Sequence, residues 1–323
     1  MASQSRLRTA IADGALIVPV GDIAVMRPEA NYDISAVTRR AQIVHTTYTA
    51  HEAWKAAGYD VALTLDKVAV AIVVVPRSKA LARSMVADAC AKAQLVIVDG
   101  YKTDGIDSLF KGCRKVLGNL PSVTKDHGRI FWFEATDAFA DWAAPPPAKG
   151  ADGFFQTAGV FSDGAIDKGS ALLAAALPQK LLPHMADFGA GWGYLAGAAL
   201  QRAGIKSIDL VESEALSLEC AKLNVTDPRA RFVWGDATQH RADKGYDGII
   251  MNPPFHSGRA ATPSLGQAFI AGAARALAPH GKLWMVANRH LPYEQHLRDH
   301  FRNVDELTGN GAFKIFHATR PQK

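Results

Sequence analysis

Short apolar runs alternate with longer segments of helical periodicity in the second half of the chain. Such runs are typical of strands buried in a sheet, and the segments between them repeat apolar positions every three to four residues. This alternation predicts an α/β fold, with helices on both faces of a doubly wound, mostly parallel sheet. The predicted strands cover residues 184–188, 207–211, 230–234, 246–251 and 282–287, and the predicted helices cover residues 194–203, 214–224 and 264–277, with Ser213 as the cap of the second helix.

The first half of the chain repeats the later part of this pattern. Its predicted strands cover residues 68–75, 95–99 and 128–134, with helices over residues 79–92 and 105–116. Residues 98–116 match residues 286–304 at a constant separation of 188 (286 − 98), which indicates two tandem Rossmann-like domains from a diverged duplication. Chance similarity between two βαβ units is the alternative. Only the second copy contains a glycine-rich turn, so the N-terminal copy is predicted to be degenerate.

A run of three prolines after Ala144 marks the predicted domain boundary. Successive prolines continue neither a helix nor a central strand, and they favour a stiff, extended linker. The sequence therefore predicts a first domain over residues 1–143, a linker over residues 144–153 and a second domain over residues 154–323.

Composition and charge narrow the class of protein. The chain has 323 residues, of which 48% are hydrophobic and 21% charged, as in ordinary globular proteins. The longest apolar run, residues 68–75, is far shorter than the roughly 20 residues of a membrane span. Asp13 and Gly14 interrupt the place of a secretory h-region, so we expect no signal peptide. A cytoplasmic protein without a membrane partner is predicted.

Neither a disulfide framework nor a metal site is predicted. The three cysteines are far apart and form no CxxC pair: Cys90, Cys113 and Cys220. His296 and His300 lie one helical turn apart but lack the glutamate of an H-E-x-x-H site, so an exposed helix face is expected there. The net charge of +5 permits a nucleic-acid partner without establishing one.

A glycine-rich turn follows the predicted strand 184–188. Gly189, Gly191 and Gly193 follow the pattern G-x-G-x-G, which differs from the G-x-G-x-x-G of dinucleotide sites. Glycines between a strand and a helix let backbone amides approach a ligand closely. Asp187 ends the strand before them, where a carboxylate favours a ligand with an ammonium group and repels a pyrophosphate.

Two further acids follow the next two strands. Glu212 closes the strand 207–211, where a carboxylate can accept both hydroxyls of a ribose. Asp236, followed by Ala237, can accept a hydrogen bond from an adenine amine. Helix capping is the alternative for each acid alone. Three acids at successive strand ends favour an adenosyl ligand with a positively charged tail.

The strand 246–251 runs into Asn252, Pro253, Pro254 and Phe255. The prolines fix an extended turn and remove two N–H donors, which leaves the Asn252 side-chain oxygen and the Pro253 carbonyl as acceptors. Such a corner can hold both hydrogens of a planar NH₂ group, and Phe255 offers a surface on which a base can stack. A purely structural Pro-Pro turn is the alternative.

These motifs resemble class I S-adenosylmethionine-dependent methyltransferases that modify amino nitrogens. More narrowly, three segments resemble the ribosomal RNA guanine-N2 methyltransferases of the RsmC/RlmG type: residues 159–170, 252–256 and 287–293. The resemblance implies a non-catalytic N-terminal domain for RNA or substrate recognition and a catalytic C-terminal domain. It covers about residues 157–320 in detail, and only the architecture of the first 150 residues.

The resemblance also implies roles for individual residues. The cofactor S-adenosylmethionine is expected to contact Asp187, Gly189, Ala190, Gly191, Gly193, Glu212, Asp236, Ala237 and Asn252, with Phe161, Asp167 and Ser170 closing over its methionine end. Asn252, Pro253 and Phe255 are the expected catalytic residues. Pro254, His256 and Arg259 are candidate substrate contacts; His256 can accept a proton or simply line the site, and an ordinary surface loop is the alternative for Arg259.

The predicted reaction is methyl transfer to the exocyclic N2 amine of a guanine, with small-subunit 16S rRNA as the first candidate. The partner is ribosomal RNA or an assembled subunit, and the resemblance favours a monomer. Large-subunit rRNA, an adenine N6 and a protein glutamine are alternative acceptors. A nicotinamide-dependent oxidoreductase and a non-enzymatic RNA-binding module are the alternatives from other classes.

Overall fold

The chain forms two compact units, Met1–Pro146 and Pro147–Lys323. The computed structural model describes residues 5–37, 41–160, 165–254 and 263–322, with the side chain of Pro263 left out. The division falls inside the predicted linker, between the second and third of its prolines. Within the described ranges, no helix is both long and apolar enough to cross a membrane.

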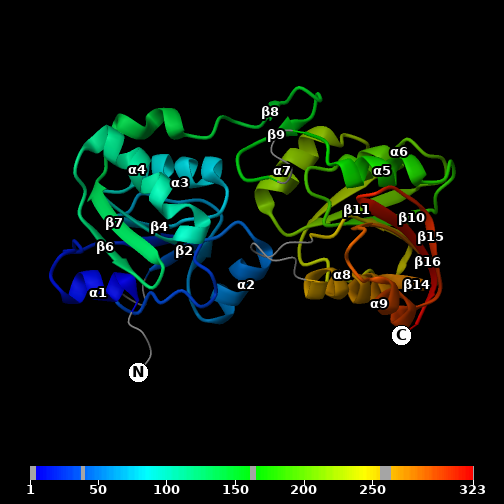
Figure 1. Ribbon diagram of the computed structural model, residues 1–323. Coiled ribbons are helices and arrows are strands. Elements are labelled where there is room, and N and C mark those ends of the chain that lie inside the picture. Colours follow the sequence, from blue (N-terminus) through cyan, green and yellow to red (C-terminus); the bar gives the residue numbers. More distant parts are fainter. Residues whose placement is uncertain (1–4, 38–40, 161–164, 255–262, 323) are drawn as a thin grey trace. The chain divides into compact units, whose positions relative to one another are not determined.

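The first unit is built on a seven-stranded sheet of order β3-β2-β1-β4-β5-β7-β6 (Figure 1). The strands from β3 to β5 pair in parallel, and β7 and β6 close the sheet antiparallel. The strands are β1 (Ile23–Met26), β2 (Gln42–Val44), β3 (Val61–Ala62), β4 (Val70–Val74), β5 (Leu95–Tyr101), β6 (Ser122–Lys125) and β7 (Gly128–Glu134). The helices are α1 (Arg6–Ala12), α2 (Tyr48–Ala56), α3 (Lys79–Lys92) and α4 (Ile106–Leu117), with 3₁₀ turns η1 (Lys102–Asp104) and η2 (Asp137–Trp142).

The second unit repeats this sheet in the order β12-β11-β10-β13-β14-β16-β15. Its strands are β10 (His184–Phe188), β11 (Ser207–Glu212), β12 (Ala230–Trp234), β13 (Tyr246–Met251), β14 (Leu277–Asn288), β15 (Phe301–Gly309) and β16 (Phe313–Pro321). The helices are α5 (Lys168–Ala176), α6 (Tyr194–Leu200), α7 (Ala215–Asn224), α8 (Pro263–Ala276) and α9 (Glu294–His300). The α/β fold with two mostly parallel sheets, predicted from the sequence, is confirmed.

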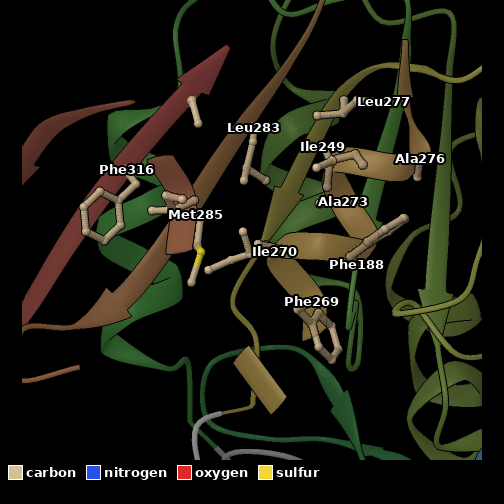
Figure 2. Packing of buried hydrophobic residues seen from close by; sticks show 14 of the residues in the cluster. Phe188, Ile249, Phe269, Ile270, Ala273, Ala276, Leu277, Leu283, Met285 and Phe316 are labelled. Atoms are coloured by element: carbon tan, nitrogen blue, oxygen red, sulfur yellow. The ribbon is translucent and has the colours of Figure 1, made fainter. Parts of the chain in front are cut away.

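Helices cover both faces of the second sheet. In Figure 1, α5, α6 and α7 lie on one side of it, and α8 and α9 lie on the other. Figure 2 shows Phe188, Ile249 and Met285 of three strands packed against Ile270 and neighbouring side chains of α8. Leu173 of α5, Leu195 of α6 and Ile250 of β13 belong to the core on the opposite face. The strands are therefore buried on both sides, as their continuous apolar runs predict.

Two details of the helices differ from the sequence prediction. The helix α6 ends at Leu200 instead of residue 203, because Ala203 pairs with Lys180 and donates its N–H to the Gln179 carbonyl. The cap of α7 is Glu214, whose side chain accepts from the Leu216 amide, so the prediction of Ser213 as the cap was wrong. The Ser213 carbonyl instead accepts a hydrogen bond from the Trp234 indole at 2.8 Å.

The chain that follows the prolines folds back onto the second unit. The strands β8 (Ala148–Lys149) and β9 (Phe155–Gln156) form an antiparallel hairpin. The side-chain oxygen of Asn224 accepts from the Phe155 amide at 2.7 Å, and its nitrogen donates to the carbonyls of Phe155 and Trp192 at 2.9 and 3.0 Å. The end of the predicted linker is thereby fixed to α7 and to the glycine-rich turn.

The equal strand orders support the interpretation of the chain as a duplication. When the two sheets are compared by strand pairing, Val98 of β5 is equivalent to Met285 of β14. This separation is 187 residues (285 − 98), whereas the sequence comparison gave 188. The difference of one residue arises because helix similarity set the sequence match, whereas strand pairing sets the structural one.

Candidate active site

The predicted site residues lie at one edge of the second sheet. Gly189, Asp236 and Asn252 directly or closely follow the carboxyl ends of β10, β12 and β13, and Glu212 ends β11. These four strands are parallel neighbours in the order β12-β11-β10-β13. Open α/β sheets bind ligands beyond the carboxyl ends of their strands. The fold therefore brings together residues that are far apart in the sequence.

The glycine-rich turn forms an open cradle between β10 and α6. Gly189, Gly191 and Gly193 have φ of 72°, 55° and 91°, a region that side chains other than glycine rarely adopt. No described atom lies within 4 Å of a Cβ built on Gly191, whereas a Cβ on Gly193 would lie 2.8 Å from Val225. Space for a ligand is thus left at Gly191, while Gly193 packs tightly onto the chain beyond α7. Ala190, between them, is buried.

Asp187 is placed differently from the sequence prediction. Its side chain has no exposed surface, and its Oδ2 accepts a hydrogen bond from the Ala196 amide of α6 at 2.9 Å. Its Oδ1 has no hydrogen-bond partner among the described residues. Burial, with a smaller contribution from the charge of Glu212, raises the pKa of Asp187 to about 8. The carboxyl group thus braces the start of α6 and is closed off from solvent, whereas the sequence predicted an acid open to a ligand ammonium.

Glu212 is held by two backbone amides. Its Oε2 accepts from Gly191 and its Oε1 from Glu214, both at 2.8 Å. Desolvation raises the pKa of Glu212, and hydrogen bonds from the backbone of Glu214, Gly191 and Ser213 oppose this rise. Because a carboxylate has about four acceptor positions, Glu212 can also accept from a ribose beside Gly191.

Asp236 closes a turn after β12. Its Oδ1 accepts from the Thr238 amide at 2.8 Å and from the Thr238 hydroxyl at 2.7 Å. No helix lies between β12 and β13 in the described chain, so Asp236 caps a turn rather than a helix, and it does so through one of its two carboxylate oxygens. Ala237 is buried in the core formed with α8.

Asn252 meets two residues from the start of α5. Its Nδ2 donates to Asp167 Oδ2 and to Ser170 Oγ, both at 2.8 Å. Asp167 and Ser170 were expected at the cofactor, and their contact with Asn252 was not predicted. No sequence signal indicates it, because the partners are separated by 85 and 82 residues and meet only when α5 packs onto the sheet.

The remaining predicted residues are described only in part. Pro253 is buried and Pro254 is exposed. The predictions for Phe161, Phe255, His256 and Arg259 concern residues outside the described part of the chain. Within that part, no cluster of three or more histidine, cysteine or acidic side chains is arranged to hold a metal ion.

The first unit fills the equivalent cradle with its own side chains. The Arg27 amide donates to the Val44 carbonyl at 2.8 Å, as Gly189 does to Val211 at 2.9 Å, so Arg27 occupies the position of the first glycine, with φ of 53°. The Arg27 guanidinium hydrogen-bonds the hydroxyls of Thr46 and Thr47.

The acidic positions of the first unit have also changed. His45 stands in the place of Glu212, and its Nδ1 accepts from the amide two residues later at 3.1 Å. By strand register, Val25 of the first unit is equivalent to Asp187 of the second, and Val74 is equivalent to Asn252. The features that form the cradle are thus confined to the second unit.

Comparison with known proteins shows the family of this chain. The family model described as "Methyltransferase small domain" matches residues 152–317. The ribosomal RNA small subunit methyltransferase C of Shewanella halifaxensis is 32% identical over 260 residues, which are 76% of this chain and 75% of that protein. The chain belongs to the methyltransferase small domain family. The ribosomal RNA large subunit methyltransferase G of Shewanella amazonensis is 35% identical over 167 residues, 50% of this chain and 44% of that protein.

A solved structure extends the match to both units of this methyltransferase family member. The T. thermophilus 16S rRNA guanine-N2 methyltransferase RsmC, in complex with AdoMet and guanosine, superimposes with a TM-score of 0.81 at 23% identity. The match covers 98% of this chain and 91% of RsmC. At this identity the match shows the fold. The family and the fold predicted from the sequence are both confirmed.

Proposed function

We propose that the chain is an S-adenosylmethionine-dependent methyltransferase of the N2 amine of a guanine in small-subunit ribosomal RNA. The observation that carries the proposal is the amide of Asn252, whose two donors are both engaged by Asp167 and Ser170. Its oxygen is thereby left to accept from a substrate amine at the strand end next to the glycine cradle.

The cradle fits the proposed cofactor. The open space at Gly191 lies beside Glu212, whose carboxylate keeps acceptor positions for a ribose. Asp236 keeps one carboxylate oxygen for an adenine amine, since Oδ1 takes both bonds from Thr238. Gly189, Gly191, Glu212 and Asp236 would hold S-adenosylmethionine, and Asp187 would support them from behind. When bound, this cofactor supplies the electrophilic methyl group.

The Asn-Pro-Pro corner would orient the acceptor. The Asn252 side-chain oxygen and the Pro253 carbonyl accept the two hydrogens of the guanine amine, which turns the nitrogen lone pair out of conjugation. Chain residues thus contribute position and electrostatics, effects that lower barriers without a strong base. The amine proton leaves during or after transfer. A guanine in a paired region must first be flipped out to reach this corner.

The small subunit is favoured by the coverage of the relatives. The match to the S. halifaxensis small-subunit enzyme extends over three quarters of both chains, and a second match, from Hahella chejuensis, over 73% of this chain. The match to the large-subunit enzyme of S. amazonensis covers half of this chain. Large-subunit rRNA is the second candidate.

We further propose that the first unit recognises substrate and does not bind cofactor. Arg27 and His45 occupy its former cradle. A pocket elsewhere in this unit is lined by Lys79, Arg83 and Trp142, and the Arg83 guanidinium lies 5.1 Å from the centre of the Trp142 ring. Cationic and aromatic side chains are those that bind phosphates and unpaired bases.

Transfer of labelled methyl groups tests the function. The protein is incubated with S-[methyl-³H]-adenosylmethionine and with 30S and 50S particles from cells that lack the enzyme, and the RNA is digested for nucleoside analysis. We expect label in N2-methylguanosine of the 30S particle. Asn252→Ala should lower the rate by about 10²–10³-fold, the usual effect of losing one transition-state hydrogen bond.

Asn303→Ala is the matched control, because Asn303 is exposed on β15 and its side chain donates to the Thr319 hydroxyl, far from the strand ends that carry the site. It should retain full activity. Label in 50S RNA would move the assignment to the large subunit. Absence of label from both particles, despite binding of the cofactor, would exclude an rRNA substrate and direct the search to adenine or protein acceptors.

A further inference from the structure

The contacts of Asn252 determine which way its amide faces. Both hydrogens of Nδ2 are engaged, one by Asp167 Oδ2 and one by Ser170 Oγ, each at 2.8 Å. The planar amide therefore presents Oδ1 away from these two residues. Asn252 and Asp167 are half-buried, and Ser170 is buried with 8% exposure, so water competes weakly for these bonds.

The two partners of Asn252 differ in how they affect the orientation of its amide. A serine hydroxyl both donates and accepts, so Ser170 bonds either orientation of the amide. An ionised carboxylate only accepts, and the reversed amide would place Oδ1 against Asp167 Oδ2. Asp167 alone therefore selects the orientation, and Ser170 strengthens it.

Asp167 is itself fixed by the start of α5. The same Oδ2 accepts from the Ser170 amide at 2.8 Å as the N-cap of this helix, and the Asp167 carbonyl accepts from Ala171 at 2.9 Å. A Cβ added to Gly169 would lie 3.1 Å from this oxygen and 3.1 Å from the Phe313 ring. A side chain at residue 169 would therefore disturb the carboxylate, and the hydrogen bonds at the start of α5 hold it where it orients the amide.

We propose that Asp167 and Ser170 are positioning residues that hold the Asn252 amide with its oxygen toward the amine to be methylated. The inference rests on the proposed function. It replaces the expectation that these residues serve the cofactor. A reversed Asn252 amide would place its N–H groups against the hydrogens of the substrate amine. The reaction thus depends on the Asp167 carboxylate, which touches neither reacting atom.

Two substitutions of Asp167 separate positioning from helix capping. Asp167→Ser keeps a good N-cap but removes the carboxylate, whereas Asp167→Glu keeps a carboxylate in a poorer cap. We expect Asp167→Ser to lower kcat at least about 10-fold, as for a misplaced reactive group, with KM for rRNA, cofactor Kd and Tm little changed. Asp167→Glu should lose Tm and keep more of kcat than Asp167→Ser. Ser170→Ala should lower kcat less than Asp167→Ser.

Amide hydrogen exchange gives a readout that needs neither cofactor nor RNA. With asparagine labelled in its side-chain nitrogen, the Asn252 signal is assigned by its loss in Asn252→Ala. We expect slow exchange of both amide hydrogens in the unsubstituted protein and in Asp167→Glu, and at least about 10-fold faster exchange in Asp167→Ser, since an unbonded amide is open to water.

The outcomes separate this inference from the proposed function. Unchanged kcat and exchange in Asp167→Ser would overturn the positioning role. A loss confined to cofactor Kd would return Asp167 to the cofactor and also overturn it. If the unsubstituted protein transfers no methyl group to rRNA, the proposed function fails, and amide exchange alone then decides whether Asp167 orients Asn252.

Discussion

Asp187 is an acidic residue whose pKa is strongly raised by burial. A carboxyl group that is fully buried behind α6 favours the neutral form, and its pKa rises from 3.8 to about 8. Between these two pH values the folded chain binds a proton that the unfolded chain lacks. The contribution of Asp187 to stability is therefore complete below pH 3.8 and is lost as the pH rises toward 8.

Asp187→Asn should remove this pH dependence. The amide imitates the protonated carboxyl and does not titrate. Between pH 5 and 8, the free energy of unfolding of the variant, relative to that of the unsubstituted protein, should therefore increase by on the order of 1 kcal/mol per pH unit. Urea unfolding at several pH values measures the difference. Asp305→Asn, on an exposed edge strand, controls for the loss of a charge. A difference that stays constant with pH would contradict the assignment.

At the residue scale, the sequence predicted which candidate residues end or follow the strands, but none of the contacts between their side chains. The strand ends that carry Glu212, Asp236 and Asn252 follow from apolar runs, and the structure places these residues at one sheet edge. The sequence could not predict the burial of Asp187 or the contact between Asp167 and Asn252. Both depend on how α5 and α6 pack onto the strands. Such packing leaves no local periodicity in the sequence.

At the element scale, β9 and α7 hold the glycine-rich turn in place. Asn224 at the end of α7 makes three hydrogen bonds, to the amide and carbonyl of Phe155 and to the carbonyl of Trp192. The Phe154 ring packs on Trp192 with 4.7 Å between ring centres, beside Tyr194. The chain that leaves the proline run is therefore part of the wall behind the cradle.

Asn224→Ala should loosen this wall. Three partly buried backbone groups lose a partner, which should cost about 1–3 kcal/mol of stability. It should also weaken cofactor binding several-fold, because the Trp192 carbonyl no longer anchors the turn. Chemical unfolding and isothermal titration calorimetry measure the two effects. Lys222→Ala on the same helix breaks only an exposed ion pair with Glu219 and should change neither. Unchanged cofactor affinity in Asn224→Ala would show that the contact with β9 does not support cofactor binding.

Elements were predicted best where the local pattern of apolar residues fixes both ends. The strands β10, β12, β13 and β7 and the helix α3 have the bounds expected from the sequence. The ends of α6 and the cap of α7 were missed, because a bridge to Lys180 and the side chain of Glu214 decide them. The hairpin β8–β9 was missed because two-residue strands carry no periodicity.

At the scale of the whole molecule, two copies of one fold carry one cradle. Titration of the protein with S-adenosylmethionine should give a stoichiometry of one per chain. Glu212→Ala should lower the affinity for the cofactor by at least about 10-fold, because the ribose hydroxyls lose the carboxylate that accepts from them. Each hydrogen bond to a charged group contributes about 1.5–3 kcal/mol. His45→Ala, the same truncation at the equivalent position of the first unit, should leave binding unchanged. A stoichiometry of two, or residual binding at half the sites in Glu212→Ala, would contradict this account.

The arginine in the first cradle also bears on how the duplicated halves can evolve. A return of that half to cofactor binding needs glycine at Arg27, an acid at His45 and an acid at Val25 together. Each change alone exposes a cavity, an unpaired group or a buried charge, so the intermediates lose stability and gain no activity. Under the proposal that the first half binds no cofactor, single substitutions therefore do not restore binding, and that half is free to adapt to tasks that the second half does not perform.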